Sequence, residues 1–358
     1  SYPLSKGAKM WYTGARHQMK GTLCMDIKLN QVIFHLLDAG ASEPVLSDRP
    51  MDMDANLYEY FTLCLEKAFA SDDGKNCRFL PDSAFLQEMQ QNQDFIDLSR
   101  RIAGVVFDQM LQYPDIPSGD LAIVDFSVQG VPYYGVLKLN YRPGYTHVTN
   151  VMGNGQCSTI APQRTILPGN PKADEAALID RANLTIRLIE KRYTMDDKKD
   201  FYLSTRVFSC TQALPEKEKL KAVCETAVAA VQAAYPEAAE LEDVPPFDGG
   251  TETAVELMVR NQAVENTIAV EDVRARIEEQ YPLAAPAFDE ALAETGVTPT
   301  DRVTVSPARM KRLESRSFKT ERGIEIKIPA ELCNSDEAVE FIHSAGGGLS
   351  ILIKDVLV

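Results

Sequence analysis

Lysine and arginine side chains cluster near the C-terminal end of this 358-residue chain. Residues 302–327 hold eight Lys/Arg and three Asp/Glu, a local net charge of +5 in a chain whose net charge is −15. Clustered cations attract phosphate backbones even in an acidic protein, because charges further away than about 10 Å are largely screened at cellular salt. This basic segment therefore predicts a nucleic-acid contact, most simply with double-stranded DNA. The residues expected to neutralise phosphates are Arg309, Lys311, Arg312, Arg316, Lys319 and Arg322.

A second group of cations lies in the middle of the chain, on and around an expected β-hairpin. Contacts between cations and phosphates position a protein on nucleic acid but read no bases, so both groups predict weak, salt-sensitive and sequence-tolerant binding. For both groups, the alternative interpretation is that the charges keep an exposed strand edge from aggregating. The second group consists of Arg181, Arg187, Lys191, Arg192, Lys198 and Lys199.

Motifs for catalysis are missing from the sequence. It contains no GxSxG, no phosphate-binding loop with its lysine, no HExxH and no CxxC. The four histidines and seven cysteines lie far apart, without the spacing of metal ligands or of a disulfide framework. We therefore predict a protein that is not an enzyme and that needs no cofactor or metal.

Cysteine use and hydropathy indicate where such a protein would work. Scattered cysteines fit a reducing cytoplasm. No stretch approaches the roughly 18 consecutive apolar residues that a membrane-spanning helix needs, so no membrane contact is expected.

The second group of cations lies within residues 25–212. This region predicts a domain of the α+β class, with an antiparallel sheet and helices. Alternating apolar residues predict a strand over 27–37, and helical spacing predicts helices after Asp54 and over 94–112. One hairpin is expected to turn at residues 129–132, and a second to pair 183–193 with 201–210. Residues 142–166 predict a long irregular connection, which is unusual unless it functions or moves.

The two ends of that domain are flanked by segments of different composition. Residues 1–24 have four basic residues, no acid and no periodic apolar pattern, and predict an extension outside the fold, disordered or belonging to upstream sequence. A nucleic-acid arm is the alternative. Residues 213–300 predict an acidic helical segment: residues 236–301 hold sixteen Asp/Glu and three Lys/Arg. These acids are expected to form a solvated face, or else to attract the basic segment or a basic protein.

The basic segment itself falls in a small C-terminal element, residues 301–358, for which the pattern predicts a ββαβ order. Strands are expected at 303–305, 324–328 and 349–354, and a helix from Asn334 to Gly346. The cations then lie on the connection into the second strand and on its outer face.

Several segments in order resemble the bacterial nucleoid-associated protein family of the YejK/NdpA type. They include MDIKLNQVIFHLLD, APQRTILPGN, NLTIRLIEKRY, FYLSTRVFSC and the ending SFKTERGIEIKIPAELCNSDEAVEFIHSAGGGLSILIKDV. The resemblance covers nearly the whole chain from Met25 onward. It implies a cytoplasmic protein of the bacterial nucleoid that binds nucleic acid without strong sequence preference and works with partners such as type II topoisomerase subunits.

Two hypotheses from different classes follow. In the first, the chain is a nucleoid-associated protein that binds duplex backbone through the basic segment. In the second, it is an adaptor for other proteins, for example a modulator of a DNA topoisomerase, whose acidic helices dock a basic partner and whose DNA association is indirect. Exposed sheet edges would also suit a homodimer.

Overall fold

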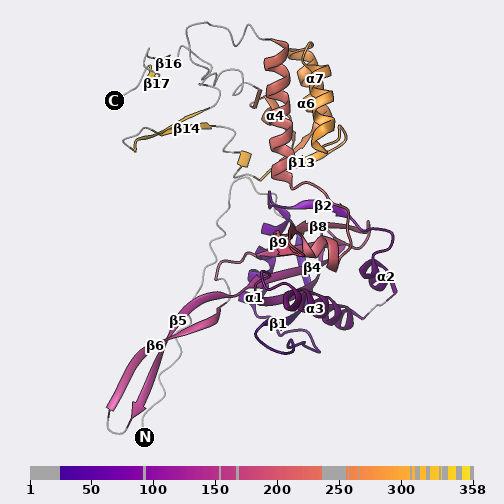
Figure 1. The fold of residues 1–358 in the computed structure, drawn as a ribbon, viewed down its shortest axis with the longest axis vertical. Coiled ribbons are helices and arrows are strands. Elements are labelled where there is room, and N and C mark those ends of the chain that lie inside the picture. Colours follow the sequence, from indigo (N-terminus) through magenta and orange to yellow (C-terminus); the bar gives the residue numbers. More distant parts are fainter. Residues whose placement is uncertain are drawn as a thin grey trace, which may run out of the picture.

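The computed structural model (Figure 1) describes residues 25–91, 94–152, 155–166, 169–235, 255–256, 258–264, 266–306, 309–310, 315–319, 323–329, 332, 338–343 and 349–354. Its first unit is built on a six-stranded antiparallel sheet in the order β1-β3-β4-β7-β8-β2. The antiparallel α+β class predicted for this region is confirmed. The strands are β1 (Ile27–Leu37), β2 (Lys75–Arg78), β3 (Gly119–Val128), β4 (Val131–Asn140), β7 (Glu175–Asp180) and β8 (Thr185–Ile189).

The predicted hairpin at residues 129–132 is confirmed, with β3 and β4 paired from Gly119↔Asn140 to Val128↔Val131. The two turn residues, Gln129 and Gly130, both have positive φ, 50° and 85°. This geometry is that of the two-residue turn whose twist matches the twist of the flanking strands.

Helices cover both faces of the sheet. Helix α1 (Ala55–Phe69) packs in one cluster with Val124 and Leu137, whereas α3 (Phe95–Gln112) packs in another with Ile123 and Val136. Because neighbouring residues of a strand point to opposite faces, the two helices lie on opposite sides. Both predicted helices are confirmed, and their N-caps are Asp54 and Asp94. A short helix that the sequence pattern did not predict, α2 (Ala84–Gln91), precedes α3.

The predicted irregular connection at 142–166 is wrong, because this segment forms a long β-hairpin. Strands β5 (Arg142–Met152) and β6 (Gly155–Ile166) pair with each other and with no other strand of the described chain. Figure 1 shows this hairpin extending away from the sheet. The side chains described at 142–149 and 157–163 are largely exposed, including Tyr145 at 73% and Ile160 at 67%. We call residues 142–166 the arm.

The second predicted hairpin is wrong in its pairing. Strand β8 pairs with β7 and β2, and the turn at Asp196 and Asp197 joins two short strands instead, β9 (Tyr193–Met195) and β10 (Lys198–Asp200). Residues Leu203–Val207, expected in a strand, form a π-helical turn, η1. The turn forms because tertiary packing favours it: Leu203, Ser204 and Val207 are buried, and the two apolar side chains join the hydrophobic cluster that contains α3.

A second unit follows, with a hydrophobic core of its own. Helix α4 (Glu216–Ala234) begins after Pro215, as predicted, and packs with α7 (Ala285–Thr295). Residues 255–256 and 258–261 are also helical. The segment predicted as helical also carries a three-stranded sheet, which includes residues of the predicted C-terminal element. The remaining members of the unit are β11 (Ala263–Val264), β12 (Thr267–Ala269), α6 (Val270–Gln280) and β13 (Arg302–Thr304).

Beyond β13, the described residues form two separate hairpins. One joins β14 (Ser315–Lys319) to β15 (Glu325–Pro329), and the other joins β16 (Val339–His343) to β17 (Leu349–Ile353). The strands expected at 324–328 and 349–354 are confirmed. The helix expected from Asn334 to Gly346 is wrong where the chain is described, because β16 occupies 339–343 and pairs with β17; the rest of that stretch lies outside the described residues.

No helix in the described part of the chain has the length and apolarity needed to cross a membrane. The predicted extension, residues 1–24, lies outside the described residues.

Candidate nucleic-acid interface

A cleft of about 570 Å³ lies where the arm joins the first unit. Its walls come from the end of α1, the segment before β7, the residues after β8, and the start of α4. Six cations and four carboxylates line it, in a chain whose carboxylates outnumber its cations overall. The cations are Lys67, Arg142, Lys172, Lys191, Arg192 and Lys217, and the carboxylates are Asp73, Asp174, Glu190 and Glu218.

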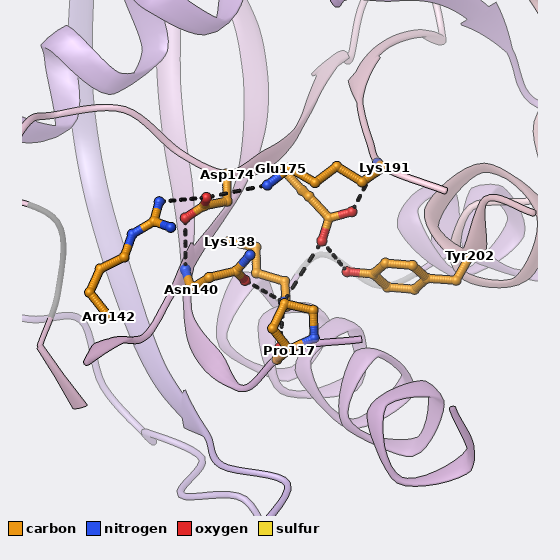
Figure 2. Close-up of polar contacts among 8 residues, drawn as sticks. All are labelled: Pro117, Lys138, Asn140, Arg142, Asp174, Glu175, Lys191 and Tyr202. Carbon is orange, nitrogen blue, oxygen red and sulfur yellow. Dashed lines mark hydrogen bonds and ion pairs between the residues drawn. The ribbon is translucent and has the colours of Figure 1, made fainter. Parts of the chain in front are cut away.

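Asp174 organises the wall beside the arm, as Figure 2 shows. Its carboxylate accepts hydrogen bonds from the backbone N–H of Asn140 at 3.0 Å and from Arg142 at 2.7 Å, and pairs with Lys191 at 3.4 Å. The two cations are about half exposed, 54% and 52%. Asp174 itself is 6% exposed and has three partners, so one cation can turn to another anion while the second cation and the N–H of Asn140 remain bonded to the carboxylate.

Beneath this wall, a buried Lys–Glu pair holds the backbone of the cleft. Lys138 on β4 lies 3.7 Å from Glu175 on β7, and their side chains are 1% and 0% exposed. Glu175 accepts hydrogen bonds from the hydroxyl of Tyr202 at 3.0 Å and from the backbone N–H of Lys191 at 3.2 Å. Burial lowers the pKa of Lys138 to about 8 and raises the pKa of Glu175. The pair therefore fixes the chain at Lys191 from below.

A second buried pair holds the next residues of the same wall. Lys75 on β2 lies 2.7 Å from Glu190, at an angle outside that of a hydrogen bond, and sits over the ring of Phe201 at 3.5 Å. Glu190 also accepts a hydrogen bond from the backbone N–H of Ser204 at 2.9 Å. On the outer side, the guanidinium of Arg192 stacks over Phe201 at 4.9 Å. Two buried carboxylates thus hold the backbone around Lys191 and Arg192, whose side chains are exposed.

Three cations of the cleft have no carboxylate partner among the described residues. Lys67 donates to the amide oxygen of Asn170 at 2.7 Å, Arg192 stacks on an aromatic ring, and Lys172 is exposed. Three of the four carboxylates, by contrast, already have cationic partners: Asp73, Asp174 and Glu190. The cleft can therefore accept an anion such as a phosphate group.

The predicted second group of cations does not share one surface. Lys191 and Arg192 line the cleft. Arg187 points inward instead, donating to the carbonyl oxygens of Ser71 at 2.7 Å and Ala68 at 3.5 Å. The others lie at separate places: Arg181 stacks over Tyr134 at 4.2 Å and pairs with Asp125 at 3.7 Å, and Lys198 and Lys199 lie on β10, the latter 3.9 Å from Asp115.

The predicted basic segment is described only in part. Arg316 and Lys319 lie on β14, and Lys319 is paired with Glu325 of β15. Arg309 is half-buried in a short helical turn, where its backbone N–H donates to the carbonyl oxygen of Ser306. Outside the six, Arg302 is 70% exposed and lies 3.7 Å from Glu271 of the acidic segment. Lys311, Arg312 and Arg322 lie outside the described residues.

Sequence reasoning missed Lys67, Arg142, Lys172 and Lys217, which come from distant parts of the chain. One signal could have found this region. No Asp or Glu occurs from Phe126 to Ala173, a run of 48 residues in a chain with 52 acids. The run contains the whole arm and four cations, Lys138, Arg142, Arg164 and Lys172.

In the described part of the chain, no group of three or more His, Cys, Asp or Glu side chains is placed to hold a metal ion. The fold and cleft thus define a mixed α+β protein whose described features include a cation-lined cleft beneath a projecting hairpin. A family model described as nucleoid-associated protein YejK matches residues 33–356, and the chain belongs to this family. No curated protein matches the chain.

Proposed function

We propose that this chain is a non-catalytic protein of the bacterial nucleoid, working in the cytoplasm, that binds the backbone of double-stranded DNA with little sequence specificity through its basic segment. Membership of a nucleoid-associated family supports the setting. The observation that carries the contact is the reversal of charge, +5 over residues 302–327 within a chain of −15. Phosphate contacts of this kind give affinity without base readout.

Titration against random-sequence duplex at two salt concentrations tests this function. If the six predicted cations each neutralise one phosphate, affinity falls by roughly 10³ between 50 and 200 mM salt. The charge-reversed variant Lys311→Glu/Arg312→Glu/Arg316→Glu should lose most binding and flatten the salt slope by about three.

A matched control separates local contact from total charge. Lys28, Arg49 and Lys221 are exposed cations outside the basic segment. The variant Lys28→Glu/Arg49→Glu/Lys221→Glu changes net charge equally and should retain most of the affinity. Equal losses in the two variants would contradict a contact through the basic segment.

The acidic helices favour a second function, docking of a basic protein. Two of their three arginines are already paired with acids, Arg274 with Glu278 and Asp289, and Arg276 with Glu279. The third, Arg260, donates to Asn261. Acids that remain exposed on α6 and α7 include Asp272, Glu290 and Glu294.

Topoisomerase subunits are the candidate partners for that surface, and the two functions give opposite results. An adaptor binds no duplex at low salt but binds a purified subunit, and loses this binding in the variant Asp272→Asn/Glu290→Gln/Glu294→Gln. The adaptor function is contradicted if the affinity for duplex falls steeply with salt and the variant binds the subunit as the wild type does.

A further inference from the structure

Between Arg142 and Arg164 the arm carries no charged residue, although it projects from an acidic protein. Residues 143–163 contain no Asp, Glu, Lys or Arg, although a quarter of the chain consists of these residues. Exposed strand edges normally carry charges, lysine above all, because a bare edge invites pairing with other molecules. A hairpin with this composition is therefore expected to have a partner.

Both faces of the arm are open to solvent where its side chains are described, at 142–149 and 157–163. Tyr145 pairs with Pro162 and His147 with Ile160, so these four side chains lie on one face, and Tyr145 and Ile160 are 73% and 67% exposed. The opposite face carries Thr146 and Thr159, which are also exposed. Thr149 and Ser158 lie on the first face and Val148 and Ala161 on the second, so both faces offer hydroxyl groups and apolar contact.

Cations stand at the foot of this arm. Arg142 begins β5, and Lys172 follows β6 after a short connection; both line the cleft together with Lys67 and Arg192. A partner that lies along the arm therefore reaches positive charge at its base and meets no carboxylate on the arm itself. This combination fits a polyanion better than a second copy of the chain, whose net charge is also −15.

We propose that the arm lies in a groove of duplex DNA while the cations of the cleft bind the phosphates beside that groove. The major groove admits a two-stranded β-ribbon. Strand β5 has 11 residues, which span about 35 Å at roughly 3.4 Å per residue, close to one turn of the duplex. Hydroxyl groups contact base edges or sugars, and exposed apolar side chains contact thymine methyl groups or sugars.

This inference rests on the proposed binding of duplex but assigns a site separate from the basic segment. The cleft supplies three cations without carboxylate partners among the described residues, so it should add about two to three to the salt slope. The variant Lys172→Ala/Arg192→Ala tests this contribution, with Lys28→Ala/Arg49→Ala as the control on other exposed cations. We expect the first to lower the slope by about two and the second to leave it unchanged.

The arm itself is tested by adding charge to the face that carries Thr146 and Thr159. Thr146→Glu/Thr159→Glu places two carboxylates on exposed strand positions, and Thr146→Gln/Thr159→Gln is the matched uncharged control. Repulsion from phosphate should weaken duplex binding at least about tenfold in the Glu variant only. Equal melting temperatures of the two variants would show that the fold is unaffected, and equal affinities would overturn the proposal.

Cys157 offers a direct readout, because it is the one exposed free cysteine of the described residues. In the variant Cys24→Ser/Cys333→Ser, which removes the two cysteines outside those residues, a photo-crosslinker on Cys157 should form an adduct with random duplex. Unlabelled duplex should compete with the adduct. An adduct only with a second protein copy would assign the arm to self-association and overturn the proposal.

Failure of this inference and failure of the proposed function give different results. If the chain binds duplex but Cys157 forms no DNA adduct and the arm variants bind normally, the arm is not a DNA contact while the proposed function stands. If the wild-type chain binds no duplex at low salt, both fall.

Discussion

At the scale of residues, the described cleft depends on charges that solvent does not reach. Two buried pairs, Lys138 with Glu175 and Lys75 with Glu190, lie under the residues that present Lys191 to the cleft. Burying an ion pair seldom stabilises a fold by itself, because desolvation offsets the attraction. We therefore interpret these pairs as devices that fix the backbone beneath exposed cations.

The variant Lys138→Met should destabilise the protein by about 3–5 kcal/mol, because it leaves the carboxylate of Glu175 buried without its cation. The double variant Lys138→Met/Glu175→Gln should recover part of this loss. Urea denaturation measures both. Lys191→Met is the control, since Lys191 is half-exposed and Asp174 keeps Arg142 and the N–H of Asn140 as partners, so the cost should be under about 1 kcal/mol. A cost of Lys138→Met as small as that of the control would contradict this interpretation.

At the scale of elements, the sequence predicted helices and hairpins correctly where a capping or turn residue sets the local backbone geometry. Asp54 and Asp94 cap the helices that follow them, and Gly130 supplies positive φ in the β3–β4 turn. The pairing partner of a strand, by contrast, depends on packing with residues far away in the sequence. Residues 201–210 alternate like a strand, yet Leu203–Val207 form a helical turn, because Leu203 and Val207 both pack into the hydrophobic core.

The β3–β4 turn gives a prediction with opposite signs at adjacent positions. Gly130→Val should lower the free energy of unfolding by about 1–2 kcal/mol, because a branched side chain is strained at φ 85°. Gln129→Asn should raise it by up to about 1 kcal/mol, because asparagine adopts φ near 50° more readily. Thermal melts of both variants check the signs. A loss in the asparagine variant would show that the turn is held by contacts rather than by backbone preference.

At the scale of the whole molecule, the two units meet through hydrogen bonds between distant parts of the chain. Asp72 accepts from the backbone N–H of Ser306 at 2.8 Å and from its hydroxyl at 2.6 Å. Glu216, at the start of α4, accepts from the backbone N–H of Thr304 at 2.6 Å and from Asn76 at 3.3 Å. These contacts fix the point from which the basic segment leaves the second unit.

The variant Asp72→Ala should therefore loosen the start of the basic segment. Losing a charged acceptor costs about 1–3 kcal/mol, so hydrogen exchange at the amide of Ser306 should speed up by roughly 10- to 100-fold. Asp73→Ala is the matched control, because the carboxylate of Asp73 lies next to Asp72 in the chain but pairs with Lys217 at the surface. Equal exchange in both variants would show that Asp72 does not hold this junction.

The sequence by itself determined the α+β class, the opening strand, the capped helices and the first hairpin, because periodicity, caps and turns act within a few residues of the chain. It also marked the basic segment, because charge can be counted without a fold. Only the tertiary structure decided that Lys67, Arg142 and Lys191 share a cleft, since they come from different parts of the chain.

The same holds for residues 142–166, which form a projecting hairpin rather than a loop. Among the described strands these two pair with each other alone, and their described side chains are mostly exposed on both faces, so alternation of apolar residues could not reveal them. Burial and proximity are properties of the folded chain, and neither the inward position of Arg187 nor the cleft beside the arm has a local signature.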